Sequence, residues 1–271
     1  MSEPRKTWQE IKSVKSTQTP LVCLTAYTAP IAKILDKHCD LLLVGDTLGM
    51  VMYGMDSTRE VSVEMMIEHG KAVMRGSQQA CVIIDLPFGS YERSPEQALQ
   101  TARRIIDETG ASGVKLEGGA PLAPSIKAIV DDGIPVVAHI GLLPQSVQTP
   151  EGFRVQGRQE SDIARLMDDA RTVEDAGAFA VVIEATVESV ASQITKALHV
   201  PTIGIGASVE CDGQILVIDD MLGLLQGHTP KFVRQYANLA EVVDKAAASY
   251  AADVRGRAFP SAEYVYRSKA S

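Results

Sequence analysis

At 271 residues the chain can form one large domain or two small ones, and its 45% hydrophobic and 22% charged residues are typical of a globular protein. No apolar run approaches the roughly 18 residues that a membrane span needs. The net charge of -8, the pI near 5.2 and the dispersed basic residues leave no basic patch for nucleic acid. We therefore expect neither a membrane nor a nucleic-acid partner.

The four cysteines stand alone at wide spacings, without a CxxC pair, so the sequence indicates neither a zinc site nor a disulfide framework. The first ten residues are polar and lack the apolar core of a signal peptide. Together these features predict a cytoplasmic protein with reduced cysteines.

Taken in order, the chain begins with Trp8, Ile11 and Val14 at the spacing of a short amphipathic helix, which we expect to cap part of the fold. From residue 21 onward, β-prone apolar runs alternate with segments of helical period. We predict eight strands, at residues 21–27, 41–46, 80–86, 113–118, 134–140, 179–184, 201–205 and 215–218.

Two of the intervening helices have clear boundary signals. Ser94 and Gln97 form a capping box around Pro95, and Gly110 ends that helix. Ser161 opens another helix, which stops at residue 177. Eight strands alternating with helices, without a linker-like stretch, predict a single (β/α)8 TIM barrel domain over residues 1–271 rather than an open doubly wound sheet.

The end of the chain is less regular. The link between predicted strands seven and eight is short and has no clear helical pattern. Residues 230–250 predict a final helix, and residues 259–271 predict an extended tail of the kind that often packs on a neighbouring subunit.

Polar residues stand at the ends of the apolar runs. In a (β/α)8 barrel the carboxyl ends of the strands share one face, where side chains are placed for chemistry. The residues at these positions are Thr25, Tyr27, Asp46, Thr47, Asp85, Lys115, Glu117, His139, Glu184 and Ser208. Four carboxylates so close together would repel unless a cation neutralised them, and two or three of them with water would suit Mg²⁺.

Several of these residues also have a purely structural interpretation. Asp85 could simply start a turn, and His139 could be a satisfied core histidine. Lys115 and Glu117 alternate on one strand and could form an internal ion pair. In the functional interpretation, Lys115 holds a substrate carboxylate, Glu117 holds metal, and Glu184 is a general base at the end of a run that would desolvate it.

The other motifs give weaker indications of function. The chain has no GxGxxG after its first strand and no GxxxxGK[ST], so dinucleotide and P-loop functions lose their main support. Residues 204–208 form either a phosphate-binding loop or a tight turn over the barrel mouth. The four remaining histidines are expected at the surface; they are His38, His69, His199 and His228.

Six motifs closely resemble those of the ketopantoate hydroxymethyltransferase family. The likeness runs from about Thr7 to the Phe259-Pro260 tail, with the motifs in family order. They are VGDTLGMV at 44–51, DLPFGSY at 85–91, VKLEGG at 114–119, HIG at 139–141 with PQS at 144–146, VQGR at 155–158 and CDGQ at 211–214.

The resemblance implies a TIM barrel of the phosphoenolpyruvate/pyruvate superfamily that assembles as a homodecamer and acts in pantothenate biosynthesis. Such an enzyme transfers a hydroxymethyl unit from its co-substrate 5,10-methylenetetrahydrofolate to 3-methyl-2-oxobutanoate, giving 2-dehydropantoate. The magnesium ligands that the motifs imply are Asp46, Asp85 and Glu117, of which the first two coordinate directly. The implied substrate-binding residues are Asp46, Thr47, Asp85, Lys115 and His139, and the implied catalytic base is Glu184.

Some positions depart from the family pattern. Thr47 replaces a serine, Thr28 an aspartate, Leu143 a threonine and Ser208 a glycine. None of these changes removes an implied ligand or the base, but they alter the expected pocket size and folate contacts.

The chemistry also fits the residues without the resemblance. A 2-keto acid can chelate magnesium through its carboxylate and keto oxygens, which stabilises the enolate formed when C3 loses its proton. Two other hypotheses stay open: an aldolase in which Lys115 forms a Schiff base without metal, and a non-catalytic barrel that binds a small acid as a scaffold. The many ionisable groups at one mouth argue against the scaffold, because they would cost stability without function.

Overall fold

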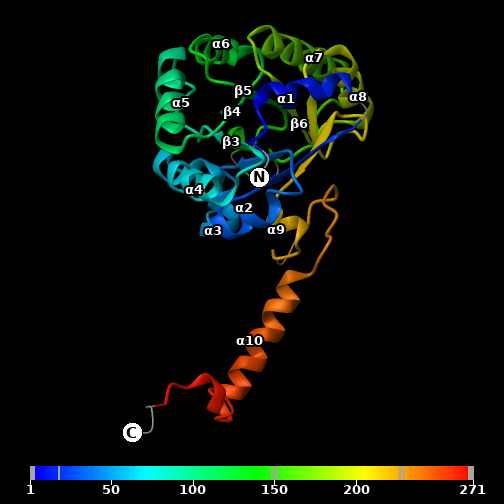
Figure 1. Cartoon of the computed structure of the whole chain (residues 1–271). Coiled ribbons are helices and arrows are strands. Elements are labelled where there is room, and N and C mark those ends of the chain that lie inside the picture. Colours follow the sequence, from blue (N-terminus) through cyan, green and yellow to red (C-terminus); the bar gives the residue numbers. More distant parts are fainter. Residues whose placement is uncertain are drawn as a thin grey trace. The chain divides into compact units, whose positions relative to one another are not determined.

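The computed structural model describes residues 4–17, 19–147, 149, 152–225, 227 and 229–267. Eight parallel strands close into a barrel in chain order (Figure 1), which confirms the predicted TIM barrel. The strands are β1 Leu21–Thr25, β2 Leu41–Val44, β3 Cys81–Asp85, β4 Gly113–Glu117, β5 Val136–Gly141, β6 Ala180–Glu184, β7 Thr202–Ile205 and β8 Gly213–Leu216.

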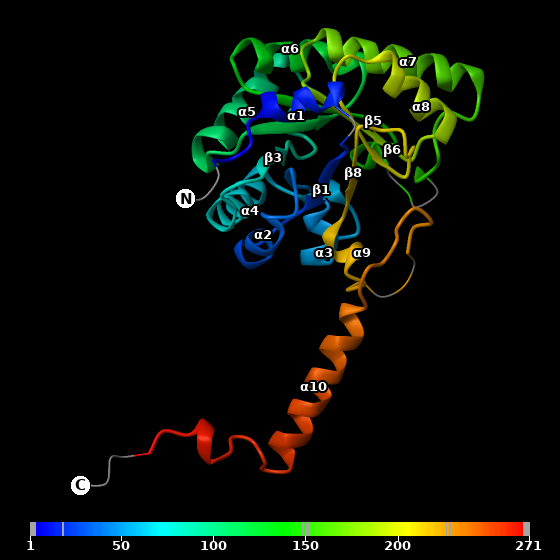
Figure 2. The same ribbon diagram turned by 45° about the vertical axis from the view of Figure 1, so that its right-hand side comes forward.

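The eighth strand begins earlier than predicted and ends at Leu216, so the predicted bounds of 215–218 were wrong. Pairing of β8 with β1, visible in Figure 2, begins where Leu21 lies opposite Gly213. A Cβ atom at Gly213 would lie only 2.6 Å from the Cβ of Leu21, so the close approach requires glycine. At the other end, the amide of Ile218 donates to Thr25 Oγ1 and already belongs to the next helix.

Helices cover the outside of the barrel. The helices between strands are α2 Ala29–Leu35, α3 Leu48–Tyr53, α4 Val63–Gly76, α5 Pro95–Thr109, α6 Ala123–Asp131, α7 Glu160–Asp175 and α8 Glu188–Ala197, with 3-10 turns η2 Thr58–Glu60, η3 Ala120–Leu122 and η4 Pro144–Ser146. The predicted cap of α5 is confirmed, because Ser94 Oγ accepts from the amide of Gln97. Helix α7 begins at Glu160, one residue before its predicted start.

A short N-terminal helix, α1 Trp8–Ser13, closes one end of the barrel interior and continues into η1 Val14–Ser16. Its capping box joins Thr7 and Glu10. The side chain of Ile11 is 1% exposed and packs with the first apolar residues of the strands. The predicted amphipathic helix is therefore confirmed, and what it caps is the amino end of the strands.

Inside the barrel, side chains change from apolar to charged along the strand direction. Alternate residues of a strand point to the same face. In β3, Ile83 belongs to the apolar cluster and the next inward residue is Asp85; in β6, Val182 is followed in the same way by Glu184. The apolar floor therefore supports a charged layer at the carboxyl ends of the strands.

The chain divides into two compact units, Met1–Ile218 and Asp219–Ser271. The second unit contains most of α9 Ile218–Met221, α10 Leu239–Arg255 and η6 Ala262–Tyr264. Helix α10 begins at 239 rather than at 230 as predicted, because Asn238 caps it through the amide of Glu241. Residues 268–271 of the predicted tail lie outside the described residues. No helix in the described part of the chain is long and apolar enough to cross a membrane.

Candidate active site

The barrel places the predicted polar residues at the carboxyl ends of neighbouring strands. Asp85 ends β3, Lys115 and Glu117 lie on β4, His139 lies on β5 and Glu184 ends β6. Strand register puts Asp85 beside Lys115 and Glu117 beside His139. Asp46 joins them two residues after β2, where its amide donates to Asp85 Oδ2 over 3.1 Å.

These side chains form a continuous chain of contacts. Lys115 Nζ lies 3.1 Å from Asp85 Oδ1 and 3.3 Å from His139 Nδ1. On its other side, His139 Nε2 lies 3.2 Å from Glu184 Oε2. The Glu184 side chain keeps 16% exposure, compared with 3% for His139, so Glu184 is where this chain of contacts meets solvent.

The contacts of His139 assign its protonation state. Burial, and then the charge of Lys115, lower the pKa of His139 from its ordinary value, so the ring is neutral at neutral pH. The ammonium of Lys115 can only donate, so Nδ1 must be the acceptor and the proton lies on Nε2. This Nε2 lies within ion-pair distance of the Glu184 carboxylate, although the contact does not have hydrogen-bond geometry.

Carboxylates outnumber cations in this cluster. Burial and the neighbouring charge of Asp85 raise the pKa of Asp46 to about 7. Burial also raises the pKa of Glu117 above its ordinary range, although Lys115 opposes the shift. Burial disfavours the charge on Lys115, but Asp85, Glu117 and Asp46 outweigh it and raise its pKa. The site therefore holds a firmly charged ammonium and an excess of acidic oxygens.

Gln145, which the analysis of strand ends missed, links the acidic residues to one another. Its side-chain amide donates to Asp46 Oδ2 over 2.7 Å and to the carbonyl of Leu86 over 3.0 Å, and its backbone amide donates to Glu117 Oε2 over 2.9 Å. Its Oε1 accepts from the hydroxyl of Tyr91. Gln145 follows a proline in a 3-10 turn outside the strands, so strand periodicity could not reveal it. The sequence feature that could have identified Gln145 was its position in the PQS motif at 144–146.

We expect Gln145→Met to destabilise the barrel by about 2 kcal/mol, because it leaves the buried carboxylate of Asp46 and the carbonyl of Leu86 without the amide that donates to both. Gln145 is 2% exposed, so water cannot readily replace the lost hydrogen bonds. Urea unfolding of the full chain measures the change. Gln9→Met on the exposed face of α1 is the control and should leave the unfolding midpoint in place. A Gln145→Met midpoint equal to that of the control would contradict the linking role.

The backbone around Glu184 is held tightly. Its carbonyl accepts from the amide of Leu142 and from Thr186 Oγ1. Gly141 has φ +95°, and a Cβ there would lie 2.3 Å from the Glu184 carbonyl oxygen, so only glycine allows β5 to approach β6 here. Ala185 adopts φ 42°, a region that costs non-glycine residues about 1–3 kcal/mol and that occurs preferentially at functional sites.

The other predicted strand-end residues lie apart from this chain of contacts. Thr25 Oγ1 accepts from Ile218, and Ser208 Oγ donates to Glu188 of α8 over 2.8 Å. A carboxylate at that loop is unfavourable for a phosphate. Thr47, half-buried, begins the first turn of α3 directly after Asp46, and Tyr27 is buried just beyond β1.

Of the histidines expected at the surface, two are exposed: His38 and His199. His69 is instead half-buried on α4, with Nδ1 2.7 Å from the carbonyl oxygen of Tyr27, and His228 lies outside the described residues.

The donor set fits a hard divalent cation. Asp85 Oδ1 is buried and has no hydrogen-bond partner, only the ion pair with Lys115. Asp46 lies beside Asp85, and burial together with the charge of Asp85 raises the pKa of Asp46. Among the described residues no three acidic, histidine or cysteine side chains converge into a ready ligand set. Two adjacent carboxylates with open positions suit Mg²⁺, which retains water ligands.

Comparison with known proteins gives a family match over most of the chain. The family model described as ketopantoate hydroxymethyltransferase matches residues 5–262. A 3-methyl-2-oxobutanoate hydroxymethyltransferase from Brucella suis is 54% identical over 99% of this chain and 98% of its own length. A protein of the same name from Rhodospirillum rubrum is 55% identical over 97% and 95%.

Solved structures share the fold at low identity. Phosphoenolpyruvate phosphomutase from Streptomyces platensis superposes with a TM-score of 0.61 at 11% identity, covering 97% of this chain and 92% of that one. A 2,3-dimethylmalate lyase of the PEP mutase/isocitrate lyase superfamily gives 0.57 at 15%, covering 96% and 91%. These likenesses show that the TIM-barrel fold is shared.

Proposed function

Because the chain belongs to the ketopantoate hydroxymethyltransferase family, we propose that it catalyses the reaction for which its relatives are named, 3-methyl-2-oxobutanoate hydroxymethyl transfer. The keto acid receives one carbon from 5,10-methylenetetrahydrofolate, and water supplies the new hydroxyl oxygen. The products are 2-dehydropantoate, on the route to pantothenate, and tetrahydrofolate. The observation that carries this proposal is the buried chain from Asp85 through Lys115 and His139 to Glu184.

Lys115 binds the carboxylate of the keto acid as a point charge. Its ammonium is buried and kept charged by the surrounding carboxylates, and a buried cation attracts an anion more strongly than an exposed one. The hydroxyl of Thr47, next to Asp46, makes no cap hydrogen bond to α3, and we propose that it hydrogen-bonds the same substrate.

Asp46 and Asp85 would hold Mg²⁺, with Glu117 as an outer partner fixed by the amide of Gln145. When bound, the cation draws electron density from the keto carbonyl and makes the C3 proton more acidic.

Glu184 takes the C3 proton. Its Oε2 lies 3.2 Å from His139 Nε2, and this close contact restricts where the carboxylate can lie. The tight backbone at Gly141 and Ala185 fixes the position from which the carboxylate reaches into the mouth. C3 then attacks the methylene carbon of the folate, forming the new carbon–carbon bond as the bond from that carbon to one folate nitrogen breaks. Water replaces the second folate nitrogen on the same carbon, which supplies the hydroxyl group and releases tetrahydrofolate.

The aldolase alternative uses Lys115 as a nucleophile. A Schiff-base lysine has to be neutral to attack, and therefore needs a lowered pKa. The carboxylates around Lys115 have the opposite effect. The structure therefore favours the hydroxymethyl transfer over the aldolase.

The experiment that tests the proposed function is product formation from 3-methyl-2-oxobutanoate and 5,10-methylenetetrahydrofolate, with magnesium and with chelator. We expect 2-dehydropantoate only when a divalent cation is present. Equal formation in excess chelator would contradict the metal-assisted reaction.

Asp85→Asn should weaken Mg²⁺ binding by about tenfold or more while the barrel still folds, since it removes one of two adjacent anionic ligands. Calorimetric titration of Mg²⁺ into the variant measures the change. Asp212→Asn is the matched control, because Asp212 also pairs with a lysine, Lys15, at 2.9 Å. The control should keep the Mg²⁺ affinity of the parent chain. Unchanged affinity in Asp85→Asn would remove Asp85 from the site.

We also propose that the enzyme works in the cytoplasm as a homodecamer. The scattered, unpaired cysteines, which are all free and buried, support the location. The exposed apolar side chains of α10, among them Val242, Val243 and Tyr250, support assembly, because such side chains usually become covered in an oligomer.

A further inference from the structure

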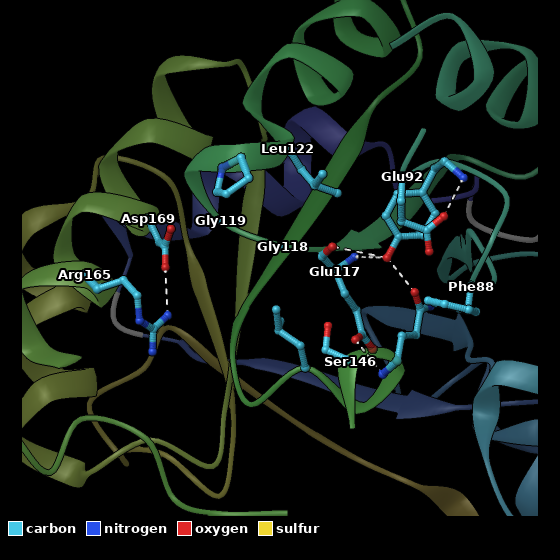
Figure 3. A pocket seen from close by; sticks show the side chains of 13 residues that line it. Phe88, Glu92, Glu117, Gly118, Gly119, Leu122, Ser146, Arg165 and Asp169 are labelled. Atoms are coloured by element: carbon cyan, nitrogen blue, oxygen red, sulfur yellow. Dashed lines mark hydrogen bonds and ion pairs between the residues drawn. The ribbon is translucent and has the colours of Figure 1, made fainter. Parts of the chain in front are cut away.

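A cavity of about 300 Å³ lies beside the acidic cluster (Figure 3). It shares two of its walls, Glu117 and Gln145, with that cluster, but Asp46, Lys115, His139 and Glu184 do not line it. The figure shows Glu117 and Ser146 between the Arg165–Asp169 pair on one side and Phe88 on the other. The cavity is thus a second chamber that adjoins the acidic cluster at these two shared residues.

We propose that this cavity receives the pterin ring of the reduced folate donor. The inference rests on the proposed function, because hydroxymethyl transfer needs a second substrate whose methylene carbon reaches C3 of the keto acid. The donor ring must therefore lie next to the acidic cluster, and this chamber adjoins it. Its volume lies at the lower end of the range for small-molecule sites, about 300–1,000 Å³, enough for a flat bicyclic ring.

The walls of the chamber match the two surfaces of a pterin. Phe88, Leu122 and Leu143 provide apolar contact for the flat ring faces. At one side, Arg165 Nη1 lies 3.1 Å from Asp169 Oδ2, and this pair presents both N–H donors and carboxylate acceptors. The edge of a pterin carries a carbonyl oxygen and N–H donors side by side, which needs both kinds of partner.

Asp169 is held firmly enough to serve as such a partner. It is 7% exposed, and its Oδ1 accepts from the amide of Ala120 over 2.8 Å. Glycine at 119 makes this approach possible, because a Cβ there would lie 1.9 Å from Asp169 Oδ1. The loop after β4 and helix α7 are thereby joined at the chamber, and the carboxylate keeps unused acceptor positions.

Leu143 connects the chamber to the departures from the family pattern. It stands where the resemblance leads us to expect threonine, and the structure places it in the chamber wall next to the turn that carries Gln145. The change replaces a hydroxyl by a larger apolar group, which favours contact with a ring face over hydrogen bonding.

The test is calorimetric titration of the full-length enzyme with tetrahydrofolate, and separately with 3-methyl-2-oxobutanoate in the presence of Mg²⁺. Leu143→Trp fills the chamber, and Ile34→Trp on the exposed side of α2 is its control. Arg165→Ala removes the polar edge, and Arg103→Ala is its control, since both arginines pair with an aspartate and are 48% and 53% exposed.

We expect Leu143→Trp and Arg165→Ala each to weaken tetrahydrofolate binding by about tenfold or more, with a much smaller change in keto-acid affinity. The two controls should bind both ligands like the parent chain. Arg165 is on the surface, so its variant tests the inference even if the tryptophan disturbs folding. Parent-like folate affinity in Arg165→Ala and in folded Leu143→Trp, or a selective loss of keto-acid affinity, would overturn the inference. Failure of the parent chain to bind the keto acid would instead count against the proposed function.

Discussion

Glu184→Gln should lose turnover by a factor on the order of 10² to 10⁴, the usual contribution of a positioned base. The parent enzyme with Mg²⁺ and 3-methyl-2-oxobutanoate should exchange the C3 proton for solvent deuterium without folate, and the variant should lose this exchange to the same extent. The physical reason is that an amide has nearly the shape of a carboxylate but cannot accept the proton. Glu184 is also the member of the contact chain that reaches solvent.

NMR of the C3–H signal measures the exchange directly. Glu188→Gln is the matched control, because Glu188 is a nearby glutamate that serves Ser208 rather than the acidic cluster. Keto-acid and Mg²⁺ affinities should stay close to those of the parent chain in both variants. Undiminished exchange in Glu184→Gln would assign the base to another group, with His139 the next candidate. Absence of exchange in the parent chain without folate would mean that deprotonation waits for the second substrate.

Lys115→Met should lower kcat/KM by roughly 10² to 10³, because truncating one partner of a buried charge pair costs about 2–5 kcal/mol. Lys115→Arg should keep part of the activity, since it preserves the charge that attracts the substrate carboxylate. Removing the ammonium in Lys115→Met also leaves Asp85 without its ion-pair partner, so this variant should unfold more easily.

Steady-state kinetics and urea unfolding of the same variants separate the two effects. Lys15→Met removes an ion pair with Asp212 at the other end of β8 and should cost stability without changing KM for the keto acid. Borohydride in the presence of 3-methyl-2-oxobutanoate should leave Lys115 unmodified. Covalent trapping of the substrate on Lys115 would contradict the point-charge role and favour the aldolase.

Much of the barrel could be predicted because local sequence is informative about strands that are buried on both faces. A run such as Leu41–Val44 has no polar face, which excludes an exposed strand, and its alternation with capped helices leaves few topologies. Strand eight was predicted less well, because its start depends on the close approach of Leu21 to Gly213 rather than on its own composition. The predicted start of the last helix at residue 230 was wrong for a related reason. The helical periodicity of the sequence extends beyond the helix itself, whereas the Asn238 cap sets where the helix begins.

The sequence by itself determined which side chains would stand at the barrel mouth. Strand periodicity and the ends of the apolar runs are local properties, and they identified Asp85, Lys115, His139 and Glu184 before any contact was known. Only the tertiary structure decided which of these residues touch. Strand register placed Asp85 against Lys115 and turned His139 between Lys115 and Glu184, which in turn fixed its tautomer and the charge of the lysine.

Gln145 and the chamber beside Glu117 depended on tertiary structure in the same way. Gln145 hydrogen-bonds both Asp46 and Glu117, and it lies 99 residues from Asp46 along the chain. A cavity between the loop after β4 and helix α7 has no sequence pattern of its own. Local propensity describes each segment separately, whereas contacts, burial and pKa shifts arise only when closure of the barrel brings distant segments within a few ångströms of one another.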